Sequence, residues 1–81
     1  NSLYLRFEVK DKPGVLSEIT KLFANNNISI ERVIQIPDLK NKSASIVIIT
    51  HKSLEQRSQN LIRSLKKNKN IIKKPILIRL F

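Results

Sequence analysis

Residues 3–16 read LYLRFEVKDKPGVL and contain the turn that decides the fold. Apolar and polar side chains alternate over residues 3–10, and this period of two is typical of a strand that buries one face. Residues 11–14 interrupt the alternation with Asp-Lys-Pro-Gly, because proline fixes φ and glycine accepts turn conformations. The apolar residues then recur at helical spacing, which predicts a helix that ends within residues 25–27. The apolar side of this helix consists of Val15, Leu16, Ile19, Leu22 and Phe23.

The rest of the sequence predicts three more strands and a second helix. Charged Arg32 interrupts the β-branched residues 28–36, which indicates a bulge or an edge position. Residues 43–50 contain four contiguous apolar residues, so this strand should be central or should present its second face to another chain. A capping box at residues 53–56 predicts the start of the second helix, and residues 75–81 form the closing strand. This order predicts an α+β fold, a ferredoxin-like βαββαβ sandwich whose antiparallel sheet carries two helices on one face.

Apolar side chains in the second half of the chain divide between the core and the outer face of the sheet. The second helix should pack into the core through Leu54, Leu61, Ile62 and Leu65. The outer face of the sheet should carry Val47, Ile49, Leu77 and Phe81. Exposed apolar patches usually mark an interface. With 81 residues the chain has room for one core, so residues 1–81 are predicted to form a single domain.

The composition restricts the possible functions. Sixteen Lys and Arg residues against six Asp and Glu give a net charge of +10, which indicates either an anionic partner or a compositional bias of the source genome. The basic residues are spread along the chain, and only residues 66–74 form a dense cluster. The absence of cysteine excludes disulfides and Cys-based metal sites, and no apolar run approaches the ~20 residues of a membrane span. We expect a cytoplasmic protein.

Catalysis is not predicted for this chain. His51 is the only histidine, the acidic residues form no close pair, and no Gly-x-Gly-x-x-Gly motif is present. A catalytic triad needs a nucleophile, a base and an orienting group, and a metal site needs several ligands. We therefore expect no catalytic residue, no metal ligand and no bound cofactor, and a surface or capping role for His51.

Two segments carry a resemblance to a known family. Residues 11–16, Asp-Lys-Pro-Gly-Val-Leu, followed by residues 27–30, Asn-Ile-Ser-Ile, resemble the ACT domain family. The resemblance implies a regulatory domain that binds a small ligand, usually an amino acid. Within the family the chain is most similar to the carboxyl-terminal ACT domains of bacterial homoserine dehydrogenases, through residues 4–7, 28–35, 46–51 and 76–80. That similarity implies a carboxyl-terminal fragment of a longer, NAD(P)-dependent enzyme of amino-acid biosynthesis, allosterically regulated by threonine or a related amino acid and assembled as a homodimer or larger homo-oligomer.

The resemblance also implies where the ligand binds. Gly14, Val15 and Leu16 lie at the start of a helix, where unpaired backbone N–H donors and the helix dipole favour the binding of a carboxylate. The ligand ammonium needs acceptors, for which Asp11, Asn27 and strand carbonyls near Ile28 are candidates. ACT sites commonly lie between paired domains, so Gln35 is assigned to the pocket of a neighbour. The predicted ligand-binding residues are Asp11, Pro13, Gly14, Val15, Leu16, Asn27, Ile28 and Gln35.

Each assignment has a structural alternative. Asp11 could cap the helix, Pro13 and Gly14 could serve only the turn, Asn27 could be only a helix C-cap, and Gln35 could be solvent-exposed. Two rival functions are a ligand-free dimerisation module and a basic RNA-binding domain. The RNA-binding alternative is the weaker one, because residues 43–50 contain no aromatic side chain on which a base could stack.

Overall fold

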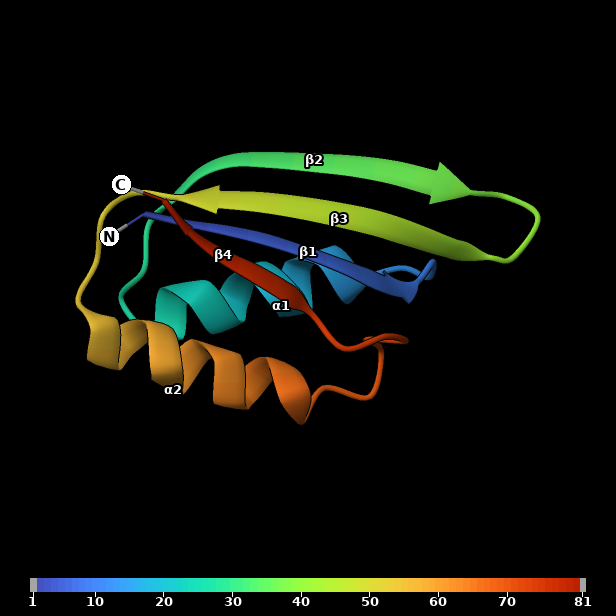
Figure 1. Ribbon diagram of the computed structural model, residues 1–81. Helices are drawn as coiled ribbons and strands as arrows, with labels where there is room; N and C mark the ends of the chain where they lie inside the picture. The colour runs from blue at the N-terminus through green and yellow to red at the C-terminus, as the bar shows by residue number, and fades with distance from the viewer. Residues whose placement is uncertain (1, 81) are drawn as a thin grey trace.

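The computed structural model describes residues 2–80 and shows a four-stranded sheet covered on one face by two helices (Figure 1). The strand order is β2-β3-β1-β4, and every neighbouring pair is antiparallel. The elements follow one another as β1 (Ser2–Lys10), α1 (Val15–Asn25), β2 (Ile30–Asp38), β3 (Ser43–Thr50), α2 (Glu55–Lys66) and β4 (Ile76–Leu80). The predicted ferredoxin-like βαββαβ fold is confirmed.

The core lies between the helices and the two central strands. Residues of β1 at odd positions are buried, and the register places Phe7 opposite Ile46 and Leu5 opposite Ile48 on the same face. Burying one side chain of this size contributes roughly 1.5–3 kcal/mol, so these alternating positions supply much of the driving force for folding. The helices complete the core with Val15, Ile19, Phe23, Leu61 and Leu65.

Strand β2 forms one edge of the sheet and is mostly exposed. It pairs only with β3, and its register shifts between Ile30 and Arg32, which confirms the predicted break. Beyond the shift, Val33 and Gln35 lie opposite Ile48 and Ile46 and therefore share the face of the helices. Val33 is nevertheless 38% exposed and Gln35 is exposed, so the helices leave this part of the sheet uncovered.

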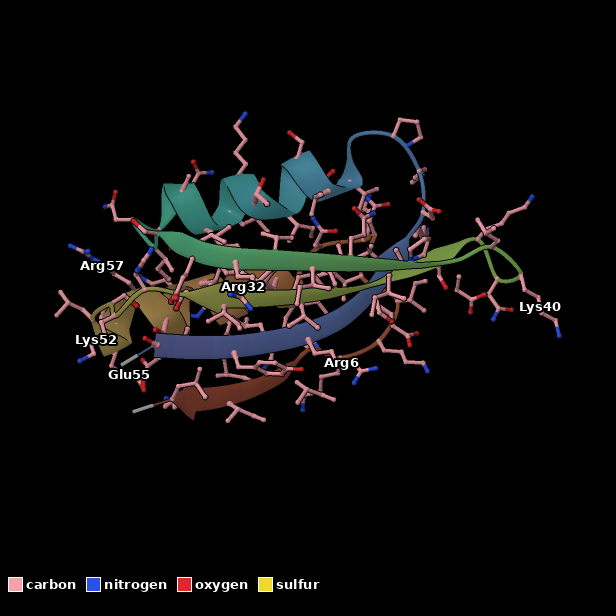
Figure 2. The ribbon with its side chains drawn as sticks, turned by 90° about the horizontal axis from the view of Figure 1, so that it is seen from above. Arg6, Arg32, Lys40, Lys52, Glu55 and Arg57 are labelled. Atoms are coloured by element: carbon pink, nitrogen blue, oxygen red, sulfur yellow. The ribbon has the colours of Figure 1, made fainter. Side chains whose placement is uncertain are left out.

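A polar turn closes the hairpin between β2 and β3. The Asp38 carboxylate accepts hydrogen bonds from the backbone N–H groups of Lys40 and Asn41 and from the Asn41 side-chain amide. These donors favour the charged form and lower the pKa of Asp38. Figure 2 shows Lys40 at the tip of this turn, at the opposite end of the molecule from Lys52, Glu55 and Arg57.

Asn27 ends helix α1 through its left-handed backbone conformation. Asn27 has φ 56°, its N–H donates to the Ala24 carbonyl, and the Ile28 N–H donates to the Phe23 carbonyl. This pair of bonds is a Schellman motif, in which a left-handed residue satisfies the last carbonyls of a helix. Ile28 is buried beside Phe23 in the core, as the motif favours.

Two details of the second half differ from the prediction. Leu54, in extended conformation, occupies the N-cap of α2 and no side chain caps the helix, so the capping box at Ser53 is wrong. Because Leu54 precedes the helix, it is 64% exposed and does not join the core stripe. Leu77 lies opposite Leu5 on the helix side, so its placement on the outer face is also wrong, and Phe81 falls outside the described residues.

The outer face of the sheet carries apolar side chains beside the charged Arg6, Glu8 and Arg32, and no helix covers it. The strand period places Val47 and Ile49 there, as predicted, together with Ile76 and Ile78 of β4. Ile76 and Ile78 are at least half exposed. This face is available for a partner.

Adjacent residues of β3 test the assignment of the two faces. We expect Ile48→Ala, at a fully buried position, to lower the free energy of unfolding by roughly 2–5 kcal/mol, because it leaves a cavity. Ile49→Ala, on the outer face, is the matched control and should cost less than about 1 kcal/mol. Urea denaturation followed by circular dichroism measures both values. Equal losses would show that the outer face is packed as tightly as the core.

Candidate functional site

The turn between β1 and α1 exposes the first turn of the helix to solvent. All four residues 11–14 are exposed, whereas Val15 directly after them is buried. The Asp11 N–H donates to the Lys42 carbonyl at 2.9 Å, which ties the turn to the start of β3. The turn therefore has a fixed position but no protein layer over it.

The opening amides of α1 include free donors. The Val15 N–H donates to the Lys12 carbonyl at 3.3 Å, and the Glu18 N–H donates to the Gly14 carbonyl at 2.9 Å. Within residues 2–80, the N–H groups of Leu16 and Ser17 have no hydrogen-bond partner, and no side chain caps the helix. Free amides at a helix N-terminus attract anions, because each is an unsatisfied donor at the positive end of the dipole.

Gly14 makes this arrangement possible through its backbone. Its φ of 84° lies in the left-handed region, which is costly for residues with a side chain. A Cβ built on Gly14 would meet no atom within 4 Å, so the glycine is required by conformation and not by crowding. The same open space leaves room for a small ligand to approach the amides.

Asp11 lies in this turn but does not cap the helix. The N-cap residue is Gly14, and the helix has no side-chain cap, so the alternative in which Asp11 serves only as a cap finds no support. The exposed Asp11 carboxylate accepts no hydrogen bond from residues 2–80 and is available to a ligand ammonium. Pro13 precedes Gly14 in the same exposed turn.

Asn27 and Ile28 lie at the other end of α1. The helix has 11 residues, and with a rise of about 1.5 Å per residue its ends are about 16 Å apart. One amino acid cannot contact both ends within a single chain. The structure thus brings together Asp11, Pro13, Gly14, Val15 and Leu16, and it separates Asn27 and Ile28 from them.

A second hollow lies at that far end. It has a volume of about 490 Å³ and lies between α1 and the start of β2. The Asn27 carbonyl accepts a weak hydrogen bond from Arg57 at 3.4 Å. The hollow is lined by Thr20, Ala24, Asn27, Ile28, Ser29 and Ile30.

Gln35 lies on the exposed edge strand β2, five residues beyond Ile30. It faces the helix side of β2 opposite Ile46, and its side chain makes no hydrogen bond to residues 2–80. Its exposure matches the structural alternative, and within residues 2–80 no hydrogen bond joins its side chain to another predicted site residue. A role in binding requires a neighbouring domain.

Sequence reasoning missed two parts of this site. The free amides belong to Leu16 and Ser17, whereas the Val15 amide is engaged by Lys12. The position of Ser17, third in the helix, was the available signal, because the first four amides of any helix lack partners within it. The contact between Asp11 and Lys42 joins segments 31 residues apart in sequence, and no local pattern predicts it.

Residues 2–80 contain neither a cluster of metal ligands nor a membrane-spanning helix. Among residues 2–80, no three His, Asp or Glu side chains gather as they would around a metal ion, and His51 is exposed at the end of β3. Neither helix that the structure describes is long and apolar enough to cross a membrane.

Known proteins with similar sequences are mostly homoserine dehydrogenases. The chain is 38% identical over 76 residues to the homoserine dehydrogenase of Neisseria gonorrhoeae and 34% identical over 77 residues to the homoserine dehydrogenase of Helicobacter pylori. The matches cover 94% and 95% of this chain but only 17% and 18% of the relatives. The chain thus spans less than a fifth of the length of these relatives.

Solved structures similar to this chain include a homoserine dehydrogenase and an ACT domain. A homoserine dehydrogenase from Thiobacillus denitrificans matches 99% of this chain with a TM-score of 0.84 and 30% identity, over 17% of its own length. The ACT domain of a GTP pyrophosphokinase from Chlorobium tepidum shares the fold with a TM-score of 0.74 at 14% identity. The sequence model of the ACT domain family matches residues 3–70. The chain belongs to the ACT domain family.

Proposed function

We propose that this chain is an amino-acid-sensing regulatory domain, and that the exposed first turn of α1 receives the ligand carboxylate. The observation that carries the proposal is the pair of free N–H groups on Leu16 and Ser17 behind Gly14. Two such donors suit a carboxylate, because charge-assisted hydrogen bonds to an anion are stronger than neutral ones. The Asp11 carboxylate, in the same turn, pairs with the ligand ammonium.

The site is completed by a second domain. Residues 11–14 are exposed, so a ligand bound by one chain alone would remain open to water on one side. The free edge of β2 can pair with the β2 edge of another copy, since unpaired strand edges favour strand addition. Figure 2 shows α1 running along the β2 side of the molecule.

Two-fold pairing through β2 would bring the divided residues together. In an antiparallel pair of edges, the two α1 helices run in opposite directions, so the start of one lies near the end of the other. Asn27 and Ile28 would then come from the neighbouring copy and face the Asp11–Leu16 turn of the first. Gln35 lies five strand residues, about 16 Å, beyond Ile30 and would fall outside that contact. The ligand would favour one arrangement of the pair and so bias an attached enzyme.

The parent protein we infer is an NAD(P)-dependent homoserine dehydrogenase of the cytoplasm. The support is the name shared by the relatives of Neisseria gonorrhoeae and Helicobacter pylori, together with the solved structure from Thiobacillus denitrificans. Threonine, an end product of that biosynthetic route, is the ligand we propose. The NAD(P) site would lie in the part of the relatives that this chain does not cover.

A ligand-free assembly module is the second candidate function. It is favoured by the uncovered outer face of the sheet, where Ile76 and Ile78 are at least half exposed. Sedimentation with and without threonine separates the two functions, because only a sensor changes its assembly state or compactness with ligand.

Removing the charge of Asp11 tests the ammonium contact. We expect Asp11→Asn to weaken threonine binding about tenfold or more, because a hydrogen bond to a charged group contributes roughly 1.5–3 kcal/mol. Glu55→Gln removes one acidic charge at the start of α2, where the carboxylate is paired with Arg79 at 2.6 Å and the glutamine oxygen can still accept that bond, and it is the matched control. Isothermal calorimetry measures both. Equal affinities for Asp11→Asn and the unmodified chain would remove Asp11 from the site.

Asn27→Gly separates the capping role of Asn27 from its binding role. Glycine accepts the φ of 56°, so the free energy of unfolding should stay within a few tenths of a kcal/mol, whereas Asn27→Ala should lose about 1 kcal/mol. If the side-chain amide contacts the ligand of a neighbouring chain, Asn27→Gly should nevertheless bind threonine more weakly. Retained binding by a stable Asn27→Gly variant would leave Asn27 with the cap alone.

A further inference from the structure

A cleft of about 360 Å³ lies between the end of α2 and the segment that leads into β4. Pockets for small ligands commonly enclose about 300–1,000 Å³, so this cleft has the size for a small molecule and not for an extended peptide. Ile72 and Pro75 belong to its apolar lining, and Lys66, Lys73 and Lys74 add three cations. It thus combines an apolar surface with positive charge.

The charge of the cleft is poorly balanced by the protein itself. Residues 66–74 contain five lysines and no acidic residue. Among the described residues, their one ion pair joins Lys73 Nζ to Glu8 Oε2 at 3.5 Å, and it is exposed enough to be screened by solvent. Lys66 and Lys74 have no acidic partner within residues 2–80. Clustered like charges repel one another, so a bound anion would relieve a cost that the free protein bears.

The wall of the cleft is held in place by β1. The Lys10 N–H donates to the Asn70 carbonyl at 2.9 Å, and the Ile72 N–H donates to the Glu8 carbonyl at 2.8 Å. These bonds continue the sheet beyond β4, and Figure 1 shows the segment turning back beside the end of β1. A ligand would meet a wall that is already ordered, which lowers the entropy cost of binding.

We propose that this cleft binds a small phosphorylated molecule that carries an apolar ring, of the nucleotide class. Lysine ammonium groups are compact point charges that suit phosphate oxygens, and three of them on one cleft match a group with more than one negative charge. The apolar lining contacts the ring. Inorganic phosphate alone would leave that lining unused.

This cleft is separate from the first turn of α1, but side-chain hydrogen bonds connect its lining to that helix. Asn68, which lines the cleft, donates its side-chain amide to the Glu18 carboxylate near the start of α1, and Asn70 donates to the same carboxylate at 3.4 Å. Occupation of the cleft therefore acts on a segment that holds the start of α1. Binding at the cleft itself requires no amino acid.

Calorimetry of the 81-residue chain tests the proposal with ADP, pyrophosphate and adenosine as probes, at about 0.15 M ionic strength, where charges more than about 8 Å apart are screened, and with EDTA. ADP should bind more tightly than either of its halves, because only ADP uses both the lysines and the apolar lining. Lys66→Gln with Lys74→Gln should weaken ADP binding about tenfold, since two charge-assisted contacts are lost. Both lysines are exposed, so this double variant should keep the circular dichroism spectrum of the parent chain.

Two controls make the outcome decisive. Lys40→Gln with Lys52→Gln removes the same charge at sites outside the cleft, which Figure 2 shows at the two ends of the molecule, and should change ADP affinity by less than about twofold. Ile72→Ser should weaken ADP binding and leave pyrophosphate binding unchanged. Three results would overturn the proposal: no binding of ADP, equal losses in the two lysine pairs, or equal affinities for ADP and pyrophosphate. Each of these results is independent of whether threonine binds at Asp11.

Discussion

The backbone of Gly14 is the constraint on which the rest of this structure depends. The chain leaves β1, a central strand with one buried face, and must enter α1 beneath the same sheet within four residues. A left-handed residue at the N-cap makes that change of direction, and at φ 84° glycine adopts it without strain. The same geometry leaves the first helical amides without a capping side chain. A requirement of folding thus produces the unsatisfied donors on which the proposed function rests.

The two edges and two faces of the sheet are unequally protected. The helix-side face is sealed over β1 and β3 by α1 and α2, whereas β2 remains exposed along nearly its whole length. A domain of this size buries only about 60–65% of its unfolded surface and gains from association. The exposed edge beside α1 and the partly apolar outer face are therefore the two surfaces on which partners would act. The two ends of α1 lie about 16 Å apart within one chain. Assembly through the β2 edge would place the start of α1 in one copy beside the end of α1 in the other.

The fold was predictable because its signals are local. A strand buries every second residue on one face, as at Leu3, Leu5, Phe7 and Val9, and a helix buries residues three or four apart, as at Val15, Ile19 and Phe23. The predictions were wrong at positions where a shift of one residue decides whether a side chain faces the core or the solvent. Helix α2 begins at Glu55, which moves Leu54 out to solvent, and β4 presents Leu77 to the core because its pairing with Leu5 sets its faces. Register is fixed by contacts between strands and was not readable from β4 alone.

The candidate site was predictable only in part, for the same reason. The Asp-x-Pro-Gly turn pointed to the start of α1, and the helix predicted between Asp11 and Asn27 already placed these residues a helix length apart. Spacing in sequence did not show that the Asp11 N–H bonds to the Lys42 carbonyl. Nor did it show that the segment after α2 folds back on β1 and forms a cleft beside Lys66. These are long-range contacts, and only the assembled sheet reveals them.

The most direct test of the central claim is the amide spectrum of the ¹⁵N-labelled chain during a threonine titration. If the first turn of α1 holds the ligand carboxylate, the largest shifts should fall on the N–H groups of Gly14, Leu16 and Ser17, and hydrogen exchange of Leu16 and Ser17 should slow. Saturable shifts that leave these three amides unmoved, or no shift at any threonine concentration in either the monomer or the assembled form, would contradict the account.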